Sequence, residues 1–370
     1  MREVEMKNFV EILENHWVSN FLFMFLGYAI PKSISLLSRA ISRARSKHNQ
    51  VGFIAGLDKR LNIETIAYGD PEFESIRITL ANEEFIIPSD REKDHEYIST
   101  YVDLESFCEA FGISIEAFWE SYDKNRDKMT DLFSHGSHGK HFNGHMFGIS
   151  SVRNFQRTTD EHELKRLKLR AYNTDYFTMS VLSGVLKDFA TPEILENVNI
   201  NNDLSYFRNS IGVNVLLILP KSNQIVMVKR SKNASFTEDN RLIYPSVVET
   251  IAKADYTKEI KVELAVIRGL QEELGLVDSD LDISSMNIFS YFYEKNYFQD
   301  NFGVTIHAKN HVTVQYLNNL VAKDGLLEVS EIFALNNNIS AIKKYISKNE
   351  PNLQYQTQYL LELYSKIGFN

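Results

Sequence analysis

Apolar and polar residues alternate with a two-residue period through much of the C-terminal half of the chain, a pattern typical of β-strands. Residues 210–230 predict a hairpin, because the runs VNVLLIL and QIVMVKR flank the turn sequence PKSN. Further strands are predicted at 241–251, 287–296, 303–310, 312–321 and 327–335. Helical spacing of apolar residues predicts helices at 258–274, 341–347 and 354–367. Residues 210–370 are therefore predicted to form one α/β domain.

Residues 51–209 also mix strand and helix patterns, so the predicted fold class is α/β (α+β) with a separate mixed α/β domain before residue 210. Residues 75–88 predict a hairpin that turns near Ala81 to Glu83, and Asp175 suits a helix N-cap. Short strands are predicted at 51–56, 63–70, 141–148 and 167–172. Residues 104–133 predict a helical hairpin. Its likeness to a DNA-binding helix-turn-helix is weak, because its glutamates stand where phosphate contacts are needed; these are Glu109, Glu116 and Glu120.

The N-terminal segment 1–48 contains a dense apolar run within residues 17–37, interrupted by Pro31 and Lys32. Acidic residues precede the run and basic residues follow it, which opposes a signal peptide and predicts that the following chain is cytoplasmic. We expect residues 17–45 to associate with a membrane, as a spanning helix in preference to one lying in the headgroup region. The alternative is an amphipathic helix packed on the protein itself, in a soluble cytoplasmic chain.

The composition of the chain argues against some classes of function. The chain has 370 residues, 44% of them hydrophobic, and a formal net charge of −9. An acidic protein is a poor non-specific binder of nucleic acid, so nucleic acid is not an expected partner. Cys108 is the single cysteine, which excludes an intramolecular disulfide and favours a reducing compartment. The sequence leaves the oligomeric state open.

Four histidines crowd a glycine-rich stretch, SHGSHGKHFNGHMFG. They are His135, His138, His141 and His145. Their spacing matches no zinc pattern and no cysteine assists, so a loop that contacts a ligand or a neighbouring domain is favoured over a metal site.

The segment AVIRGLQEELGL, residues 265–276, places one basic and two acidic side chains on a predicted helix. Arg268 and Glu272 lie one helical turn apart and can form an ion pair. Glu272 and Glu273 together offer hard oxygen ligands for a divalent cation at one end of the helix. Gly275 suits a C-terminus that needs a left-handed backbone.

These residues resemble the signature of the Nudix hydrolase superfamily, G-x5-E-x7-R-E-U-x-E-E-x-G-U, where U is aliphatic. Six of the seven positions of fixed character from Arg268 onward match. The resemblance extends from about residue 210 to the C-terminus. It implies an α/β/α sandwich with a mixed sheet, in which Mg²⁺ or Mn²⁺ held by Glu272 and Glu273 activates water to cleave a nucleoside diphosphate linked to another moiety.

The match is degenerate. Gly269 stands where the family has a glutamate that is typically a metal ligand. The glycine-rich turn upstream is absent, and eight residues separate Glu259 from Arg268, where the family has seven between its glutamate and arginine. Glu249, which follows a predicted strand, is the favoured substitute ligand. Weaker candidates for a compensating acid are Glu263, Glu328 and Glu331.

The candidate catalytic set is therefore Arg268, Glu272, Glu273 and Glu249, with the three glutamates as metal ligands and Arg230 as a substrate-binding residue. The first functional hypothesis is a metal-dependent diphosphate hydrolase. The missing glutamate at position 269 motivates a second hypothesis. In it the chain is a membrane-tethered sensor that binds a nucleotide or nucleotide-derived molecule, as in stress or defence signalling. A third is an interaction scaffold.

Overall fold

The computed structural model describes residues 53–68, 73–135, 143–155, 165–198, 204, 206–208, 210–231, 241–322 and 329–367. Its contacts divide the chain into two units, Met1–Gly56 and Leu57–Asn370. The expected membrane segment 17–45 lies outside the described residues. Among the residues that are described, no helix is both long and apolar enough to cross a bilayer.

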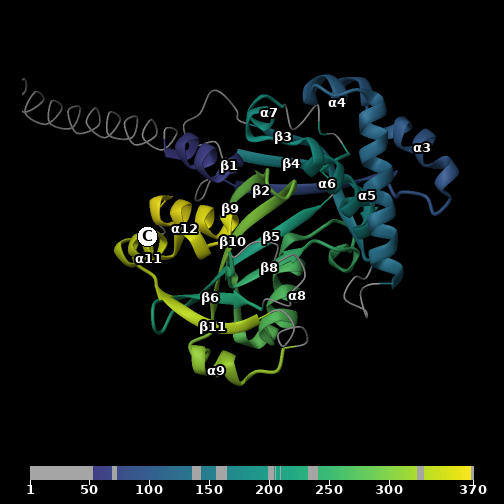
Figure 1. Ribbon diagram of the computed structural model, residues 1–370. Helices are drawn as coiled ribbons and strands as arrows, with labels where there is room; N and C mark the ends of the chain where they lie inside the picture. The colour runs from purple at the N-terminus through teal and green to yellow at the C-terminus, as the bar shows by residue number, and fades with distance from the viewer. Residues whose placement is uncertain are drawn as a thin grey trace, which may run out of the picture. The chain divides into compact units, whose positions relative to one another are not determined.

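The larger sheet of the second unit is mixed (Figure 1). Its strands follow the order β1-β9-β10-β5-β6-β11, with β8 pairing to β5 and β7 to β6. The pair β10–β5 is parallel, whereas the other pairs are antiparallel. The strands are β1 (Ile63–Tyr68), β5 (Ile211–Leu219), β6 (Gln224–Arg230), β7 (Ile243–Pro245), β8 (Val247–Thr250), β9 (Leu281–Glu294), β10 (Gln299–Ala308) and β11 (Val329–Asn336). All nine residues of β5 are buried, as its apolar run requires for a strand covered on both faces.

A second, three-stranded sheet has the order β2-β4-β3 and is also mixed. β2 (Phe73–Glu84) runs parallel to β4 (Lys165–Asp175), and β3 (His145–Phe155) runs antiparallel to β4. Its inner face contributes Ile78, Leu167 and Leu169 to the same hydrophobic core as β5 and the helix α8 (Val262–Leu274). The other face of this sheet alternates into exposed side chains.

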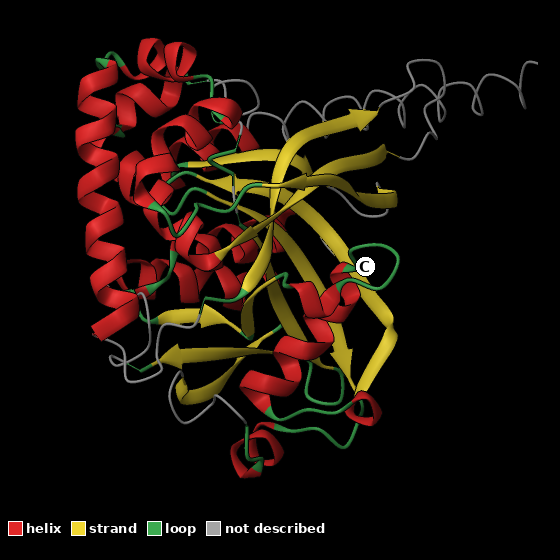
Figure 2. Cartoon of the chain, turned by 90° about the vertical axis from the view of Figure 1, so that its right-hand side faces the viewer, coloured by secondary structure: helices red, strands yellow, loops and turns green. Residues whose placement is uncertain are grey.

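Five helices between β2 and β5 build a second core rich in aromatic rings. They are α3 (Asp94–Tyr101), α4 (Leu104–Phe111), α5 (Ile115–His135), α6 (Tyr176–Phe189) and α7 (Pro192–Asn197). The helices α4 and α6 start after capping residues: Asp103 accepts a hydrogen bond from Ser106 N, and Asp175 accepts one from Thr178 N. Figure 2 shows helices along one side of the strands, and Figure 1 shows α5 as the longest of this group.

The described residues after β10 form three further helices, α9 (Val314–Asn319), α11 (Ile339–Asn349) and α12 (Tyr355–Ile367). α11 packs on β11 and on α12, and α12 also contacts β7. Short 3-10 turns lie at η1 (Arg91–Lys93), η2 (Lys253–Asp255), η3 (Asp278–Asp280) and η4 (Glu350–Asn352). The turn η2 matters for the candidate site, because it leads into α8.

The predicted mixed α/β class is confirmed, with two mixed sheets. The helical hairpin, the β5–β6 hairpin and the N-cap at Asp175 are also confirmed. The domain boundary near residue 210 stays a prediction; β1, from the predicted N-terminal domain, pairs with β9 of the large sheet.

Three predicted elements are wrong. Residues 53–61 are helical, because Leu57 and Leu61 bury one helical face while Lys59 and Arg60 stay exposed. Residues 75–84 belong to the continuous strand β2, since the expected turn contains no glycine to reverse the chain. Residues 314–319 form α9, whose start is capped by Thr313 accepting from Tyr316 N. The predicted strand 241–251 is also divided, with Ser246 separating β7 from β8.

Candidate functional site

The helix α8 places the signature residues against β8 and β5. It ends at Gly275, whose φ of 72° is left-handed. Gly275 N donates to Gln271 O at 3.0 Å and Leu276 N to Leu270 O at 3.2 Å, which closes the helix as the sequence predicted. Ala265, Val266 and Leu270 are fully buried, so Arg268 and Glu272 are held by a rigid element.

Arg268 is the centre of a dense polar cluster. Its Nε and Nη2 donate to the two carboxylate oxygens of Asp255 at 3.1 and 2.8 Å. Its Nη2 also donates to Thr250 O at 2.7 Å. Its Nη1 lies 3.2 Å from Glu249 Oε1 and 3.2 Å from Glu272 Oε2. One guanidinium therefore binds three carboxylates, with Glu249 and Glu272 sharing a nitrogen and Asp255 taking the opposite edge.

The positive charge of the partly buried Arg268 faces the negative charges of Glu249, Asp255 and Glu272. Burial raises the pKa of the Glu249 carboxyl, against the lowering effect of Arg268. For Arg268, burial acts to lower the pKa, but the hydrogen bonds that it donates to Asp255 and the charge of Glu249 outweigh burial and hold the pKa above its usual range. The arginine therefore remains a cation in every condition in which the protein is folded.

Gly269 lies where the helix touches β8 most closely. A Cβ added there meets Val247 Cγ1 at 2.6 Å and Glu249 Cβ at 3.1 Å. Val247 is fully buried and β-branched, so its side chain is stiff at χ1 and cannot move away easily. The position that carries a glutamate in the family signature therefore has no room here for any side chain.

The other residues that the sequence singled out are not among the partners of Arg268 in the described structure. Glu273 is 4% exposed and buried on the helix. The Arg230 guanidinium lies 4.6 Å from the ring centroid of Tyr244, and its Nη2 donates to Val248 O at 3.4 Å, next to Glu249. Glu263 and Glu331 are exposed on α8 and β11. Glu328, His138 and His141 lie outside the described residues, and His145 is exposed in β3.

Asp255 is the residue of this cluster that the sequence reasoning missed. It is 1% exposed, and Ala252 N donates to its Oδ2 at 2.8 Å, which fixes the turn η2. One feature of the sequence could have pointed to Asp255: it is an acid three residues after Ala252, at the end of a turn that leads into the helix. Its distance of thirteen positions from Arg268 gave no reason to join the two.

The predicted metal ligands are Glu249, Glu272 and Glu273, and the magnesium or manganese site that they would form stays a prediction. Among the described residues, no group of three or more His, Cys, Asp and Glu side chains is placed to hold a metal ion. Two of the predicted ligands, Glu249 and Glu272, already share one nitrogen of Arg268. One oxygen of each of these two carboxylates is therefore already paired with a cation, and Gly269 offers no further carboxylate.

A hollow of about 340 Å³ lies between β2 and the start of α8. Its walls include Ile76, Ile78 and Ile260, with Lys261 and Glu263 among its charged residues. This hollow adjoins the first turn of the helix, one turn before Arg268, and is mainly apolar on the β2 side.

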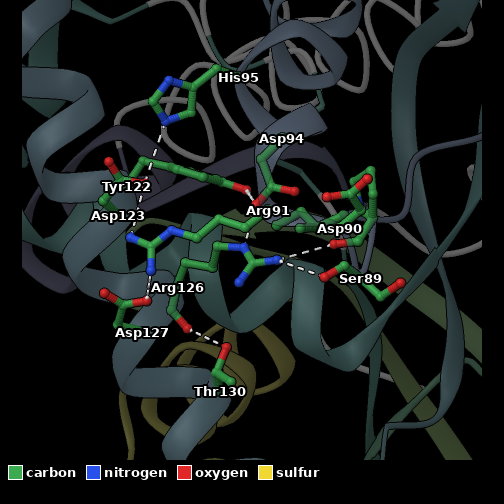
Figure 3. Close-up of polar contacts among 12 residues, drawn as sticks. Ser89, Asp90, Arg91, Asp94, His95, Tyr122, Asp123, Arg126, Asp127 and Thr130 are labelled. Atoms are coloured by element: carbon green, nitrogen blue, oxygen red, sulfur yellow. Dashed lines mark hydrogen bonds and ion pairs between the residues drawn. The ribbon is translucent and has the colours of Figure 1, made fainter.

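A second buried polar network lies at α3 and α5 (Figure 3). Asp94 is paired with Arg126 and accepts a hydrogen bond from Tyr122 OH at 3.1 Å. Arg126 Nη2 also donates to Pro88 O at 3.2 Å, which ties the loop after β2 to α5. The other oxygen, Asp94 Oδ1, is buried and accepts no hydrogen bond from the described residues. The network fastens two helices together and presents no open cavity.

No protein-family model matches the sequence, and no curated protein matches it. Among solved structures the chain is similar to a bifunctional NMN adenylyltransferase/ADP-ribose pyrophosphatase from Francisella tularensis in complex with AMP and a manganese ion. The identity is 16% and the TM-score 0.27, over 43% of this chain and 42% of that one. For a MutT/nudix family protein from Enterococcus faecalis the values are 14% and 0.22, over 34% and 43%.

A second structure of the Francisella enzyme matches with 14% identity and a TM-score of 0.28, over 79% of this chain and 91% of that one. The chain thus spans less than half the length of the first two structures. The similarity to Nudix structures is distant, and it concerns the fold.

Proposed function

We propose that the chain is a Nudix-like sensor, which binds a diphosphate-bearing nucleotide or a related molecule without hydrolysing it. The nucleotide class rests on the resemblance of residues 265–276 to the Nudix signature. The absence of turnover rests on one observation: Arg268 Nη1 lies 3.2 Å from both Glu249 Oε1 and Glu272 Oε2, so one oxygen of each of these two predicted metal ligands is already paired with a cation. Residues 210–370 are the proposed ligand-binding domain. Residues 17–45 are the proposed membrane attachment, with the rest of the chain cytoplasmic.

The physical reason is charge balance. Binding of Mg²⁺ through the carboxylate oxygens that now contact Arg268 would leave the half-buried guanidinium with fewer acids. Breaking partly buried ion pairs in this way costs about 3 kcal/mol for each partner removed. The close contact of Gly269 with Val247 excludes the extra carboxylate that would offset the loss.

The experiment uses the full chain and a panel of nucleotides, dinucleotides and sugar nucleotides, each with Mg²⁺, with Mn²⁺ and with chelator. We expect one class of ligand to raise the melting temperature in proportion to the logarithm of its concentration. We expect no phosphate or nucleoside monophosphate to be released. The matched variants are Glu272→Gln in the cluster and Glu331→Gln on the exposed face of β11.

Metal-dependent turnover that Glu272→Gln abolishes and Glu331→Gln leaves intact would overturn the proposal in favour of the hydrolase. Neither stabilisation nor turnover would point to the interaction scaffold. The membrane part is tested separately: full-length protein should sediment with membranes, and deletion of residues 1–48 should release it. A full-length chain that stays in the supernatant contradicts the membrane attachment and leaves the sensor proposal standing.

A further inference from the structure

The turn between β9 and β10 is fastened to the residues just before β1 by a set of contacts that we call the β1 clasp. Asn62 Nδ2 donates to Asn296 Oδ1 at 2.8 Å, and Lys295 N donates to Asn62 O at 3.0 Å. Asn296 Nδ2 also donates to Leu61 O at 3.4 Å. Among the described strands β1 pairs with β9 alone, so the clasp secures a strand that has a neighbour on one side only.

Glu294, the last residue of β9, holds this turn in shape from inside. Its Oε1 accepts hydrogen bonds from Asn296 N at 3.0 Å and from Asn296 Nδ2 at 2.6 Å, and its Oε2 accepts one from Tyr297 N at 2.7 Å. One carboxyl group therefore fixes both the backbone and the amide side chain of the residue on which the clasp depends. Phe298 follows with a φ of 57°, a conformation that a bulky residue keeps only while its surroundings hold it.

The carboxyl group of Glu294 is fully buried, and it forms no ion pair with the described lysines and arginines. Lys295 lies 2.9 Å from Leu195 O and 3.7 Å from Glu64, and Lys187 lies 5.9 Å from the ring centroid of Tyr297. The titratable and charged groups on the elements around the clasp are Asp58, Glu64, Lys187, Tyr293, Tyr297, Lys295 and the ion pair of Arg208 with Asp300.

Two effects on this carboxyl group oppose each other. Burial without a countercharge favours the neutral acid, whereas the three N–H donors favour the carboxylate. Burial is the larger effect, and it raises the pKa of Glu294 to about 7. A neutral carboxyl group still offers two oxygens as acceptors, so the contacts of the turn persist without a buried charge.

We propose that the β1 clasp is a proton-controlled latch, which Glu294 tightens when it takes up a proton and loosens when it releases that proton to solvent. Lys295, Asn296 and Tyr297 are all half-exposed, so a small movement of the turn admits water to the carboxylate. That movement breaks the contacts with Leu61 and Asn62 and frees the first residues of β1. The latch lies outside the Arg268 cluster and does not depend on nucleotide binding.

The first experiment measures backbone hydrogen exchange in the full chain from about pH 5 to pH 8, with each rate corrected for the intrinsic pH dependence of exchange. The reporters are the amides of Lys295, Asn296 and Tyr297, whose acceptors belong to the clasp. The open form ionises near 4.5 and the closed form near 7. The opening constant should therefore rise about tenfold per pH unit, by about 100-fold between pH 5 and 7, and then level off.

The variants separate the acid from the clasp. Glu294→Gln stays neutral, so exchange at the reporters should no longer depend on pH. The matched control is Glu64→Gln, which removes a half-buried acid of β1 and should keep the full pH dependence. Asn296→Ala removes the amide contacts and leaves the acid, so exchange at Lys295 should be fast at every pH.

The second experiment detects the proton directly. At about pH 6 exposed carboxyl groups are largely ionised. The infrared spectrum of the natural chain at this pH should contain the band of a protonated carboxyl group, and Glu294→Gln should lack that band.

Reporter amides whose corrected exchange does not change with pH overturn the proposal, as does an unchanged pH dependence in Glu294→Gln or an equal infrared band in both proteins. The amides of β5, all of whose residues are buried, serve as the reference for global unfolding. An equal rise in their exchange would show a loss of overall stability and no latch. If Glu294→Gln does not fold, the reporters and the β5 reference in the natural chain still decide.

Discussion

Replacing Gly269 by alanine sets two physical effects against each other. Alanine is favoured over glycine inside a helix by about 1 kcal/mol. The added Cβ, however, meets Val247 Cγ1 at 2.6 Å, and overpacking of a buried contact costs about 1–3 kcal/mol. Because Val247 is fully buried and stiff, we expect the steric effect to win, with a net loss of about 1 kcal/mol in the free energy of unfolding.

Gly269→Glu restores the family residue and should be worse. It adds more atoms at the same contact and brings a third carboxylate beside Glu249 and Glu272, so we expect a loss of about 4 kcal/mol. For a chain of this size, 1 kcal/mol corresponds to about 2 °C in the melting temperature. Thermal unfolding followed by tryptophan fluorescence measures both variants.

The matched control is Gly56→Ala. Gly56 is helical and exposed, and an added Cβ has no neighbour within 4 Å. This variant should therefore gain up to about 1 kcal/mol. If Gly269→Ala stabilises the protein as much as Gly56→Ala does, the close contact with β8 does not exist as described. If Gly269→Glu is tolerated and gains Mg²⁺-dependent stability, the account of the missing glutamate is refuted.

Three further predictions concern buried charges. Arg268→Met should lower the free energy of unfolding in urea by about 3 kcal/mol, because it leaves the buried Asp255 without its cation. Asp300→Asn should cost about 3–5 kcal/mol, since Arg208, 1% exposed, then keeps its charge without its acid; a loss below 1 kcal/mol would contradict this. Burial raises the pKa of Glu294 from 4.5 to about 7. The protonated side chain therefore contributes its full share to the free energy of unfolding below pH 4.5, and this share is lost as the pH rises to about 7. That loss amounts to about 3 kcal/mol, and Glu294→Gln should remove it; parallel pH curves of the two proteins would refute it.

The sequence was most informative where one local pattern decides the structure. The helix α8 and its end at Gly275 follow from apolar spacing and one left-handed position. The β5–β6 hairpin follows from two apolar runs around PKSN. In contrast, residues 51–56 and 312–321 were predicted as strands, whereas the structure has a helix at 53–61 and α9 at 314–319. Short segments with mixed patterns take their form from caps and tertiary burial, which the periodicity of a single sequence does not contain.

The candidate site was predictable in part. Arg268, Glu249 and Glu272 were expected to meet, and the structure brings them together around one guanidinium. Asp255 was missed, because the turn that brings it to Arg268 has no distinctive residue pattern. The tight fit of Gly269 was also beyond the sequence, since it depends on the distance between a helix and a strand from a different segment.

The basic residues on the exposed face of the sheet β2-β4-β3 show the same limit. The alternation in LKRLKLR is visible in the sequence, but Arg77 and Arg153 come from strands that only the fold places beside it. A cationic row is therefore a property of pairing and register, and it is absent from any single segment.

The pairing of β1 with β9 has a consequence for synthesis. Ile63 lies opposite Glu294, so β1 leaves the ribosome long before its partner exists. At translation rates of about 5–20 residues per second, the wait is roughly 10–45 s. During that interval the hydrogen-bonding edge of β1 is exposed, and a nascent chain held at a membrane by its first residues would have to keep this edge from neighbouring nascent chains until β9 emerges.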